Sequence, residues 1–284
     1  MDDQPLAYFD PEFLESDDAR PMRIIAEYLE PLRRFREQNI QDTVVFFGSA
    51  RVHSRIAAQR ALKRLRSGKH GSDYSMALKR SRKAVEWSKY YEDARDLAHR
   101  LTTWSLSLDT PRHRFVVCSG GGPGIMEAAN RGAHEAGGKT IGLNIRLPFE
   151  QGANRYITEG LHLEFHYFFM RKFWFAYLAK ALVIFPGGFG TLDEMFEILT
   201  LAQTNKLSKQ LLVIIYGREY WNAILDLLPM ADWGAISPRD LDLLQWVDSP
   251  AQAFDCLRDH LMTHHLVPET PQETQAPGIA KTRG

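Results

Sequence analysis

With 284 residues, 44% of them hydrophobic, the chain is long enough for one large α/β domain with appendages. Its 35 Lys and Arg residues balance its 35 Asp and Glu residues, so overall charge suggests neither a nucleic-acid binder nor a strongly acidic surface. The two cysteines are too few for a disulfide framework, which favours a cytoplasmic location. The acidic first residues lack the basic-then-apolar order of a secretion signal. No uncharged apolar stretch is long enough to span a membrane.

The first 40 residues are predicted to form an N-terminal extension. Residues 1–20 are acidic and are expected to be loosely ordered, whereas residues 21–36 carry apolar side chains on one helical face. Pro31 lies inside this helical pattern, so we expect it to kink the helix or to split it in two.

Residues 53–92 are rich in Lys and Arg and are predicted to be a helical insertion, divided into two halves by Gly68 and Gly71. The favoured interpretation is a solvated helical pair at the edge of the domain, and the alternative is a basic patch for anionic ligands or nucleic acid. The most basic half lacks interleaved aromatic residues, which argues against single-strand binding. Nucleic acid is therefore not an expected partner.

The rest of the chain alternates short apolar runs with helical patterns. Strands are predicted at 43–47, 114–118, 140–145, 181–185 and 211–216. Helices are predicted at 91–107, 125–136, 166–180, 192–203, 219–229 and 250–262, the last of these capped by Ser249 and Pro250. This alternation predicts an α/β fold with a doubly wound, Rossmann-like parallel sheet.

The predicted domain covers residues 41–266, and residues 267–284, rich in Pro, Gln and Thr, are predicted to be a disordered tail. Ligands of doubly wound sheets bind outside the carboxyl ends of the strands. Three glycine turns follow predicted strands and should therefore meet at that edge: Gly48, residues 120–124 and residues 187–190.

Residues 185–191 read Phe-Pro-Gly-Gly-Phe-Gly-Thr and join a predicted strand to a predicted helix. A glycine-rich turn at a helix start aims backbone N–H groups and the positive end of the helix dipole at one point, which suits a phosphate. The spacing of Thr191 and Glu194 also fits a capping box, in which both side chains only satisfy N–H groups at the helix start.

Two common phosphate motifs and a common metal motif are excluded. The dinucleotide fingerprint fails because Glu127 stands at the position of its third glycine, and the Walker A loop fails because Ala133 stands at its first. His162 and His166 lack the glutamate of a zinc helix, so no metal is expected.

What remains is a paired signature, formed by residues 120–128 and residues 186–194 with Arg171 and Lys172 between them. The pair resembles the Lonely Guy (LOG) family, the cytokinin riboside 5'-monophosphate phosphoribohydrolases and their bacterial nucleotide 5'-monophosphate nucleosidase relatives, in its longer bacterial form. The resemblance runs from about residue 44 to residue 261 and is interrupted by the basic segment.

The resemblance implies an enzyme that hydrolyses the N-glycosidic bond of a nucleoside 5'-monophosphate, such as AMP or a cytokinin riboside monophosphate, to a free base and ribose 5-phosphate. It implies no cofactor, and at least a homodimer. Arg171 and Glu194 occupy the family's catalytic positions. The phosphate loop matches Gly187, Gly188, Gly190 and Thr191. Further nucleotide contacts would come from Gly48, Ser49, Gly121, Gly122, Met126, Glu127 and Lys172, with plain packing the equal alternative for Met126 and Glu127.

Two other functions are weighed against the enzyme. Folds of this kind also serve as nucleotide sensors and cofactor carriers, so a non-catalytic binding protein is the alternative. The label of lysine decarboxylase, often given to proteins that resemble this family, is rejected because no lysine stands in a recognisable pyridoxal phosphate setting. The sequence leaves the identity of the base open.

Overall fold

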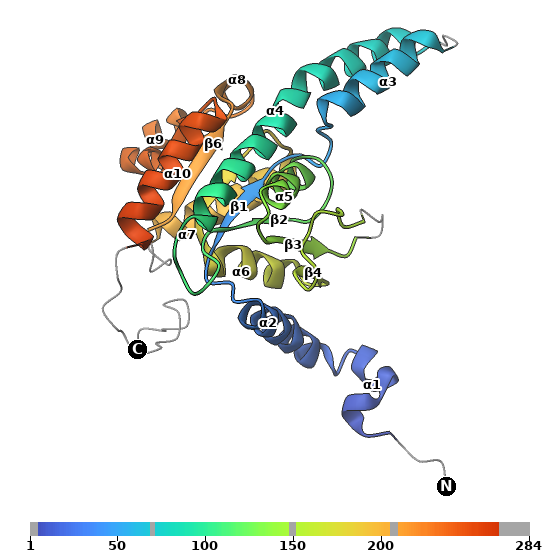
Figure 1. The fold of residues 1–284 in the computed structure, drawn as a ribbon, viewed down its shortest axis with the longest axis vertical. Coiled ribbons are helices and arrows are strands. Elements are labelled where there is room, and N and C mark those ends of the chain that lie inside the picture. Colours follow the sequence, from blue (N-terminus) through green and yellow to red (C-terminus); the bar gives the residue numbers. More distant parts are fainter. Residues whose placement is uncertain (1–4, 69–71, 148–151, 205–209, 267–284) are drawn as a thin grey trace.

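The computed structural model describes residues 5–68, 72–147, 152–204 and 210–266. Within these residues, seven parallel strands form one sheet in the order β4-β3-β2-β1-β5-β6-β7, with helices on both faces (Figure 1). The strands are β1 (Thr43–Phe47), β2 (Val116–Ser119), β3 (Thr140–Ile145), β4 (His162–Phe165), β5 (Ala179–Ile184), β6 (Leu212–Tyr216) and β7 (Leu244–Val247). The predicted doubly wound, Rossmann-like α/β fold is confirmed.

The two faces of the sheet carry separate hydrophobic cores, and β1 shows how. Val44 and Phe46 belong to one core, whereas Val45 and Phe47 belong to the other, because successive side chains of a strand point to opposite faces. The first core is covered by α4 (Tyr74–Leu106), α5 (Ile125–Glu135) and α10 (Pro250–His265), and the second by α2 (Arg20–Glu37), α6 (Phe168–Leu178) and α7 (Phe189–Gln203). A strand buried on both faces is apolar throughout, which is why β1 is visible in the sequence.

The N-terminal extension is more regular than expected. Two short helices, η1 (Ala7–Phe9) and α1 (Pro11–Glu15), precede α2. Pro31 was expected to kink the following helix or to split it in two, and the split is wrong, since α2 is one helix with Pro31 buried inside it. Pro31 cannot donate to the carbonyl oxygen of Glu27, but the indole N–H of Trp174 donates to that oxygen at 3.0 Å instead.

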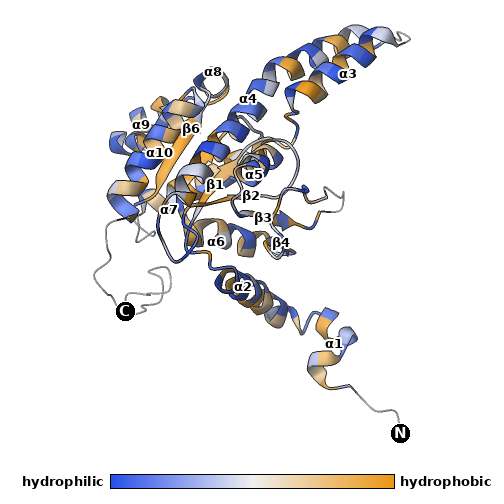
Figure 2. Ribbon diagram, viewed as in Figure 1, coloured by the Kyte–Doolittle hydropathy of each residue, from blue (hydrophilic) through white to orange (hydrophobic). Residues whose placement is uncertain are grey.

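The basic segment forms α3 (Arg55–Ser67) and the first half of α4. The break expected near residue 91 is absent, because α4 is a single helix of 33 residues whose second half packs on the sheet. Its first half and α3 project from the body as a hairpin that is mostly hydrophilic (Figures 1 and 2). We call residues 55–68 and 72–86 the basic arm.

Two strands and the region after β6 were not foreseen. β4 and β7 are four-residue strands at the two edges of the sheet, in stretches for which no strand is predicted. The single helix expected at 219–229 is replaced by α8 (Arg218–Asn222), α9 (Leu228–Asp232) and η2 (Pro238–Leu243).

The last helix begins as the sequence indicates. Ser249 caps α10 by accepting a hydrogen bond from the N–H of Gln252 at 3.3 Å, and Pro250 occupies the first helical position. The tail expected at 267–284 lies outside the described residues.

Candidate active site

The carboxyl ends of the central strands meet where the sheet changes its winding direction. From β1 the chain winds outward through β2, β3 and β4, and then crosses back to β5 on the other side of β1. Ligands of doubly wound sheets bind at such a switch point. The N–H of Ser49, after β1, donates to the carbonyl oxygen of Pro186, after β5, at 3.0 Å, so the two loops are joined at this point.

A cleft of about 930 Å³ lies at the switch point, between these loops and helices α4, α6, α7 and α8. The cleft brings together both predicted catalytic residues, the whole predicted phosphate loop and three of the further nucleotide contacts. These lining residues are Arg171, Glu194, Gly187, Gly188, Gly190, Thr191, Gly48, Ser49 and Met126.

The loop after β5 offers free backbone N–H groups. Gly188 is the N-cap of α7, and its carbonyl oxygen accepts from the N–H groups of Thr191 and Leu192 at 3.0 Å. No described residue accepts a hydrogen bond from the N–H of Phe189 or of Gly190. A Cβ atom at Gly188 or Gly190 would meet nothing within 4 Å. The helix start is therefore open, with unpaired donors and the positive end of the dipole facing the same space.

The same loop is held tightly from behind. A Cβ atom at Gly187 would stand 2.1 Å from Oγ1 of Thr191, so only glycine allows this close approach. The hydroxyl of Tyr220, on α8, donates to the carbonyl oxygen of Gly187 at 2.8 Å. These two contacts fix the loop while its N–H groups stay free.

A buried ion pair forms one wall of the cleft. The guanidinium of Arg171 donates from Nη2 to Oε1 of Glu194 at 3.1 Å, and the two side chains are 15% and 7% exposed. Burial raises the pKa of Glu194 to about 7, although the positive charge of Arg171 opposes the shift. Burial also lowers the pKa of Arg171, against the effect of Glu194.

The guanidinium of Arg171 lies over the rings of Phe168 and Phe175, each at 5.5 Å. Its Nε is buried and has no hydrogen-bond partner among the described residues. The aromatic residues of α6 thus orient Arg171, and they exclude the water that would otherwise stabilise the charge of Glu194.

The capping-box interpretation of Thr191 and Glu194 is wrong. α7 begins two residues before Thr191, with Gly188 as its N-cap and no side-chain cap. Glu194 therefore stands beyond the first turn, where no N–H group is left to cap, and it pairs with Arg171 instead.

Lys172 differs from its neighbour Arg171. Its ammonium pairs with Asp193 and Glu197, each at 2.8 Å, and Lys172 is not among the described residues that line the cleft. Lys172 is thus held by acidic residues of α7 and is turned away from the cleft.

The loop after β1 brings a second cation to the cleft. Oγ of Ser49 accepts from the N–H of Arg51 at 3.1 Å, and the Arg51 side chain is exposed. Of the described residues that line the cleft, Arg51 and Arg171 carry a positive charge, and only Arg171 has an ion-pair partner.

The loop after β2 contributes less than expected. Gly120 and Met126 line the cleft, whereas Gly121, Gly122 and Glu127 are not among its described lining residues. Oε1 of Glu127 accepts from the hydroxyl of Tyr91 at 2.6 Å, which ties it to α4.

The side chain of Asn154 holds the loop after β2 through hydrogen bonds to its carbonyl oxygens. The side-chain amide of Asn154 donates to the carbonyl oxygens of Gly121 and Gly122 at 3.0 and 3.1 Å, and to Oδ1 of Asn130 at 2.9 Å. A Cβ atom at Gly121 would stand 1.8 Å from Oδ1 of Asn144.

Several aromatic residues of the cleft gave no signal in the sequence. Trp87 comes from α4, Tyr220 from α8 and Phe175 from α6, and the rings of Trp87 and Tyr220 meet edge to face at 5.2 Å. Phe189, inside the glycine loop, is 93% exposed. No periodicity distinguishes these rings from core residues, so only the assembled fold brings them to the cleft.

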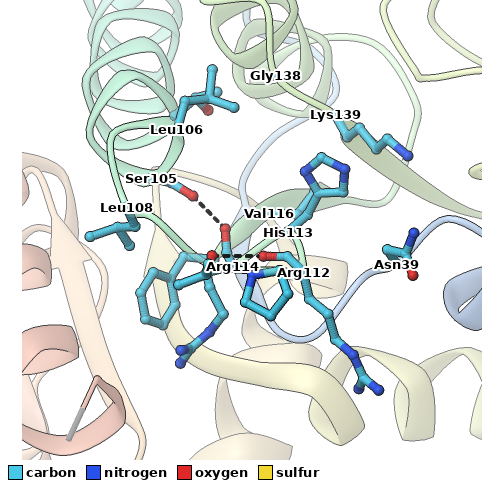
Figure 3. A pocket seen from close by; sticks show the side chains of 14 residues that line it. Asn39, Ser105, Leu106, Leu108, Arg112, His113, Arg114, Val116, Gly138 and Lys139 are labelled. Atoms are coloured by element: carbon cyan, nitrogen blue, oxygen red, sulfur yellow. Dashed lines mark hydrogen bonds between the residues drawn. The ribbon is translucent and has the colours of Figure 1, made fainter. Parts of the chain in front are cut away.

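A second cavity, of about 240 Å³, lies at the opposite edge of the sheet, before β2 and β3 (Figure 3). Three of its polar side chains are used by the fold. The hydroxyl of Ser105 donates to the carbonyl oxygen of Arg114, the guanidinium of Arg114 donates to Asp42 at 2.8 Å, and the ammonium of Lys139 donates to Gln38 at 2.7 Å.

Among the described residues, no three or more His, Cys, Asp and Glu side chains form a group that could hold a metal ion. None of the helices in the described part of the chain has the length and apolar character that crossing a membrane requires.

Comparison with known proteins gives matches at low identity. A family model described as "Possible lysine decarboxylase" matches residues 126–257. Cytokinin riboside 5'-monophosphate phosphoribohydrolase LOG3 of Arabidopsis thaliana is 26% identical over 184 residues, which are 63% of this chain and 80% of that protein. The LOG5 protein of the same plant is 31% identical over 151 residues, 52% of this chain and 61% of its own length.

Among solved structures, the molybdenum cofactor carrier protein of Chlamydomonas reinhardtii is 18% identical, with a TM-score of 0.43 over 78% of this chain and 99% of that one. The molybdenum cofactor binding protein of Rippkaea orientalis is also 18% identical, with a TM-score of 0.43 over 60% of this chain and 86% of that one.

Proposed function

The chain belongs to the LOG family, and from this membership we propose that it is a phosphoribohydrolase that splits a nucleoside 5'-monophosphate into a free base and ribose 5-phosphate. The observation that carries the proposal is the meeting of an open phosphate loop and a buried Arg171–Glu194 ion pair in one cleft. The relatives named as phosphoribohydrolases supply the reaction class.

The 5'-phosphate is proposed to bind at the start of α7. The unpaired N–H groups of Phe189 and Gly190 would donate to its oxygens, and the helix dipole favours the negative charge. Arg51 lines the same cleft without an acidic partner, so it is free to neutralise the phosphate.

Glu194 is proposed to act on the ribose. When the bond between C1' and the base nitrogen breaks, positive charge develops on the sugar, and a carboxylate nearby stabilises it. Water then bonds to C1' and gives a proton to the Glu194 carboxylate, while the departing base takes up a proton from solvent. Glu194 afterwards releases its proton to solvent, which restores the starting state. A pKa near 7 suits a group that must accept a proton at neutral pH.

Arg171 is proposed to hold Glu194 in place. Its Nη2 donates to one carboxylate oxygen of Glu194, so the other oxygen remains available to the substrate or to water. Arg171 also keeps part of the Glu194 population ionised, because its charge opposes the rise in pKa that burial produces.

The description of the matching family as a possible lysine decarboxylase finds no support in the cleft. Pyridoxal phosphate chemistry requires a lysine that forms a Schiff base with the cofactor. Of the described residues that line the cleft, none is a lysine. The nearby Lys172 forms ion pairs with Asp193 and Glu197.

The test is base release from a panel of nucleoside 5'-monophosphates, followed by chromatography, with wild type and Glu194→Gln compared. Gln keeps the shape of Glu194 but cannot accept the proton, so turnover should fall by about 10²–10⁴-fold. Asp193→Asn is the matched control, since Asp193 is 57% exposed and pairs with Lys172 instead of facing the cleft.

Full activity in Glu194→Gln would refute the mechanism. Tight nucleotide binding without release of any base from the panel would refute the enzyme and favour the non-catalytic sensor or carrier.

A further inference from the structure

The basic arm carries a large excess of positive charge, although the chain as a whole has equal numbers of basic and acidic residues. Residues 55–86 contain ten Lys or Arg residues and two acidic ones, Asp73 and Glu86, in a chain with 35 of each sign. The remainder of the molecule is therefore acidic overall. All nine basic side chains that the structure describes in the arm are exposed: Arg55, Arg60, Lys63, Arg64, Arg66, Lys79, Arg80, Arg82 and Lys83.

These charges are not neutralised within the molecule. In the described part of the arm, the ammonium of Lys83 pairs with Glu86 at 2.8 Å, and the other eight basic side chains have no ion-pair partner. Basic residues of the body, in contrast, are commonly paired, as Arg95 and Arg131 are with Glu135. The arm projects from the body of the molecule (Figure 1).

The arm presents its cations on an outer face. In α3 the buried Ala58 and the half-buried Leu62 and Leu65 share one side of the helix, and α3 packs on α4. Three of the five cations of α3, Arg60, Lys63 and Arg64, stand on its other side. A helix of 13 residues is about 20 Å long, which matches about six base pairs of a duplex.

We propose that the basic arm is a binding site for double-stranded nucleic acid, which it contacts through the phosphates. Binding of single strands depends on aromatic platforms on which bases stack. The described arm contains one aromatic residue, Tyr74, which is half-buried, so the arm offers charge without stacking. A duplex, which presents regular phosphates and hides its bases, is the polyanion that this surface fits.

This inference reverses the expectation drawn from overall charge. Equal totals of acidic and basic residues argue against a nucleic-acid binder only if the two signs are mixed over the surface, and here they are segregated.

The test is fluorescence anisotropy of the full-length protein with a labelled 20-base-pair DNA duplex and, separately, its single strand. If the arm contacts about five phosphates, affinity for the duplex should fall about 500-fold between 50 and 200 mM salt. The triple variant Arg60→Gln, Lys63→Gln, Arg64→Gln should weaken binding and reduce the slope of log K against log salt by up to about three.

The control is Arg36→Gln, Arg112→Gln, Arg239→Gln, which removes three exposed charges outside the arm and should bind the duplex like wild type. Gln is a good helix former, so the α3 variant keeps its helix. Base release from nucleotides should be the same in both triple variants, which separates this proposal from the proposed enzyme.

Equal duplex binding by the arm variant and the control would overturn the proposal. So would tighter binding of the single strand than of the duplex, or binding of anionic phosphatidylserine vesicles with no binding of the duplex.

Discussion

Two central strands of this protein end in glycine-rich loops that look alike in the sequence but differ in the structure. The loop after β2, residues 120–124, turns its carbonyl oxygens to the amide of Asn154 and packs Gly121 against Asn144. The loop after β5, residues 187–190, leaves its N–H groups unpaired and has open space at two of its glycines.

The difference shows that glycine serves two purposes here. In the first loop it allows the chain to pack closely against its own side chains, and φ of +71° at Gly121 is a backbone conformation that other residues adopt at a cost. In the second loop, Gly188 and Gly190 keep side chains out of the space where the proposed phosphate binds. Substitutions in the first loop should therefore act on stability, and those in the second on substrate binding.

Among substitutions in the two loops, the largest effect is expected at Gly190. In Gly190→Asp a carboxylate enters the open space, so kcat/KM for the nucleotide should fall by about 100-fold or more, or about 2.7 kcal/mol. The melting temperature should hardly change, because no atom lies near the new Cβ and an acidic residue suits the first turn of a helix. Gly68→Asp, in the exposed arm, is the control, and comparable activity loss in both variants would contradict the assignment of the loop.

The reciprocal substitution is Gly121→Ala. A Cβ atom here would meet Asn144 at 1.8 Å and Cα of Gly142 at 3.1 Å, in addition to the strain of positive φ. We expect a loss of about 2–3 kcal/mol of stability and a melting temperature lower by about 5–10 °C by calorimetry. Gly137→Ala shares the positive φ, of +79°, but has open space, so it should lose less. Equal losses in the two variants would show that close packing is not the cause.

A smaller effect is expected when the closed loop loses its partner. Asn154→Ala removes the donors to Gly121 and Gly122 and should destabilise the protein by about 1 kcal/mol, or about 2–4 °C in melting temperature. This loss is measured by thermal unfolding of Asn154→Ala, with Asn222→Ala, a substitution at an exposed position on α8, as the control. A large loss of activity with unchanged stability would instead place Asn154 in substrate binding.

The smallest effect is expected on the pH at which kcat/KM is half-maximal, when the charged neighbours of Glu194 are replaced. If ionised Glu194 is the active form, kcat/KM rises with pH and reaches its half-maximum near pH 7. The charge of Lys172 lowers the pKa of Glu194 and that of Asp193 raises it, so Lys172→Gln should move the midpoint up and Asp193→Asn should move it down. Each shift should be below about half a pH unit, or about 0.7 kcal/mol.

The phosphate of the substrate also ionises near pH 6, but its contribution is the same for every variant. Shifts in one direction for both variants, or no shift in either, would argue against Glu194 as the titrating group.

The parts of the fold that were predictable are those with strong local patterns. β1 and β3 were predicted residue for residue. β1 is apolar over most of its length because both of its faces are covered, and β3 carries apolar residues at alternate positions, Ile141, Leu143 and Ile145. The cap of α10 was also predicted, since Ser249 and Pro250 act within one turn. β4 and β7 were missed because they are short edge strands, which exist through pairing with β3 and β6.

The candidate site shows the same division. The grouping of Arg171 and Glu194 with the glycine loop came from resemblance to a family, and the structure brings them together in one cleft. Spacing alone favoured a capping box for Glu194, which is wrong because α7 starts earlier than its pattern indicates. Trp87 and Tyr220 could not be placed, since they reach the cleft from helices far apart in the sequence.

The sequence by itself therefore determined the order of the five predicted strands, the glycine turns that follow them and the helices between them, because apolar runs and glycines act over a few residues. Only the tertiary structure decided which glycine loop stays open, that Glu194 is buried against Arg171, and that the charges of the basic arm remain unpaired. Each of these three features depends on whether side chains from distant parts of the sequence pack against the residue or solvent surrounds it. Desolvation and long-range pairing arise only when the chain has folded.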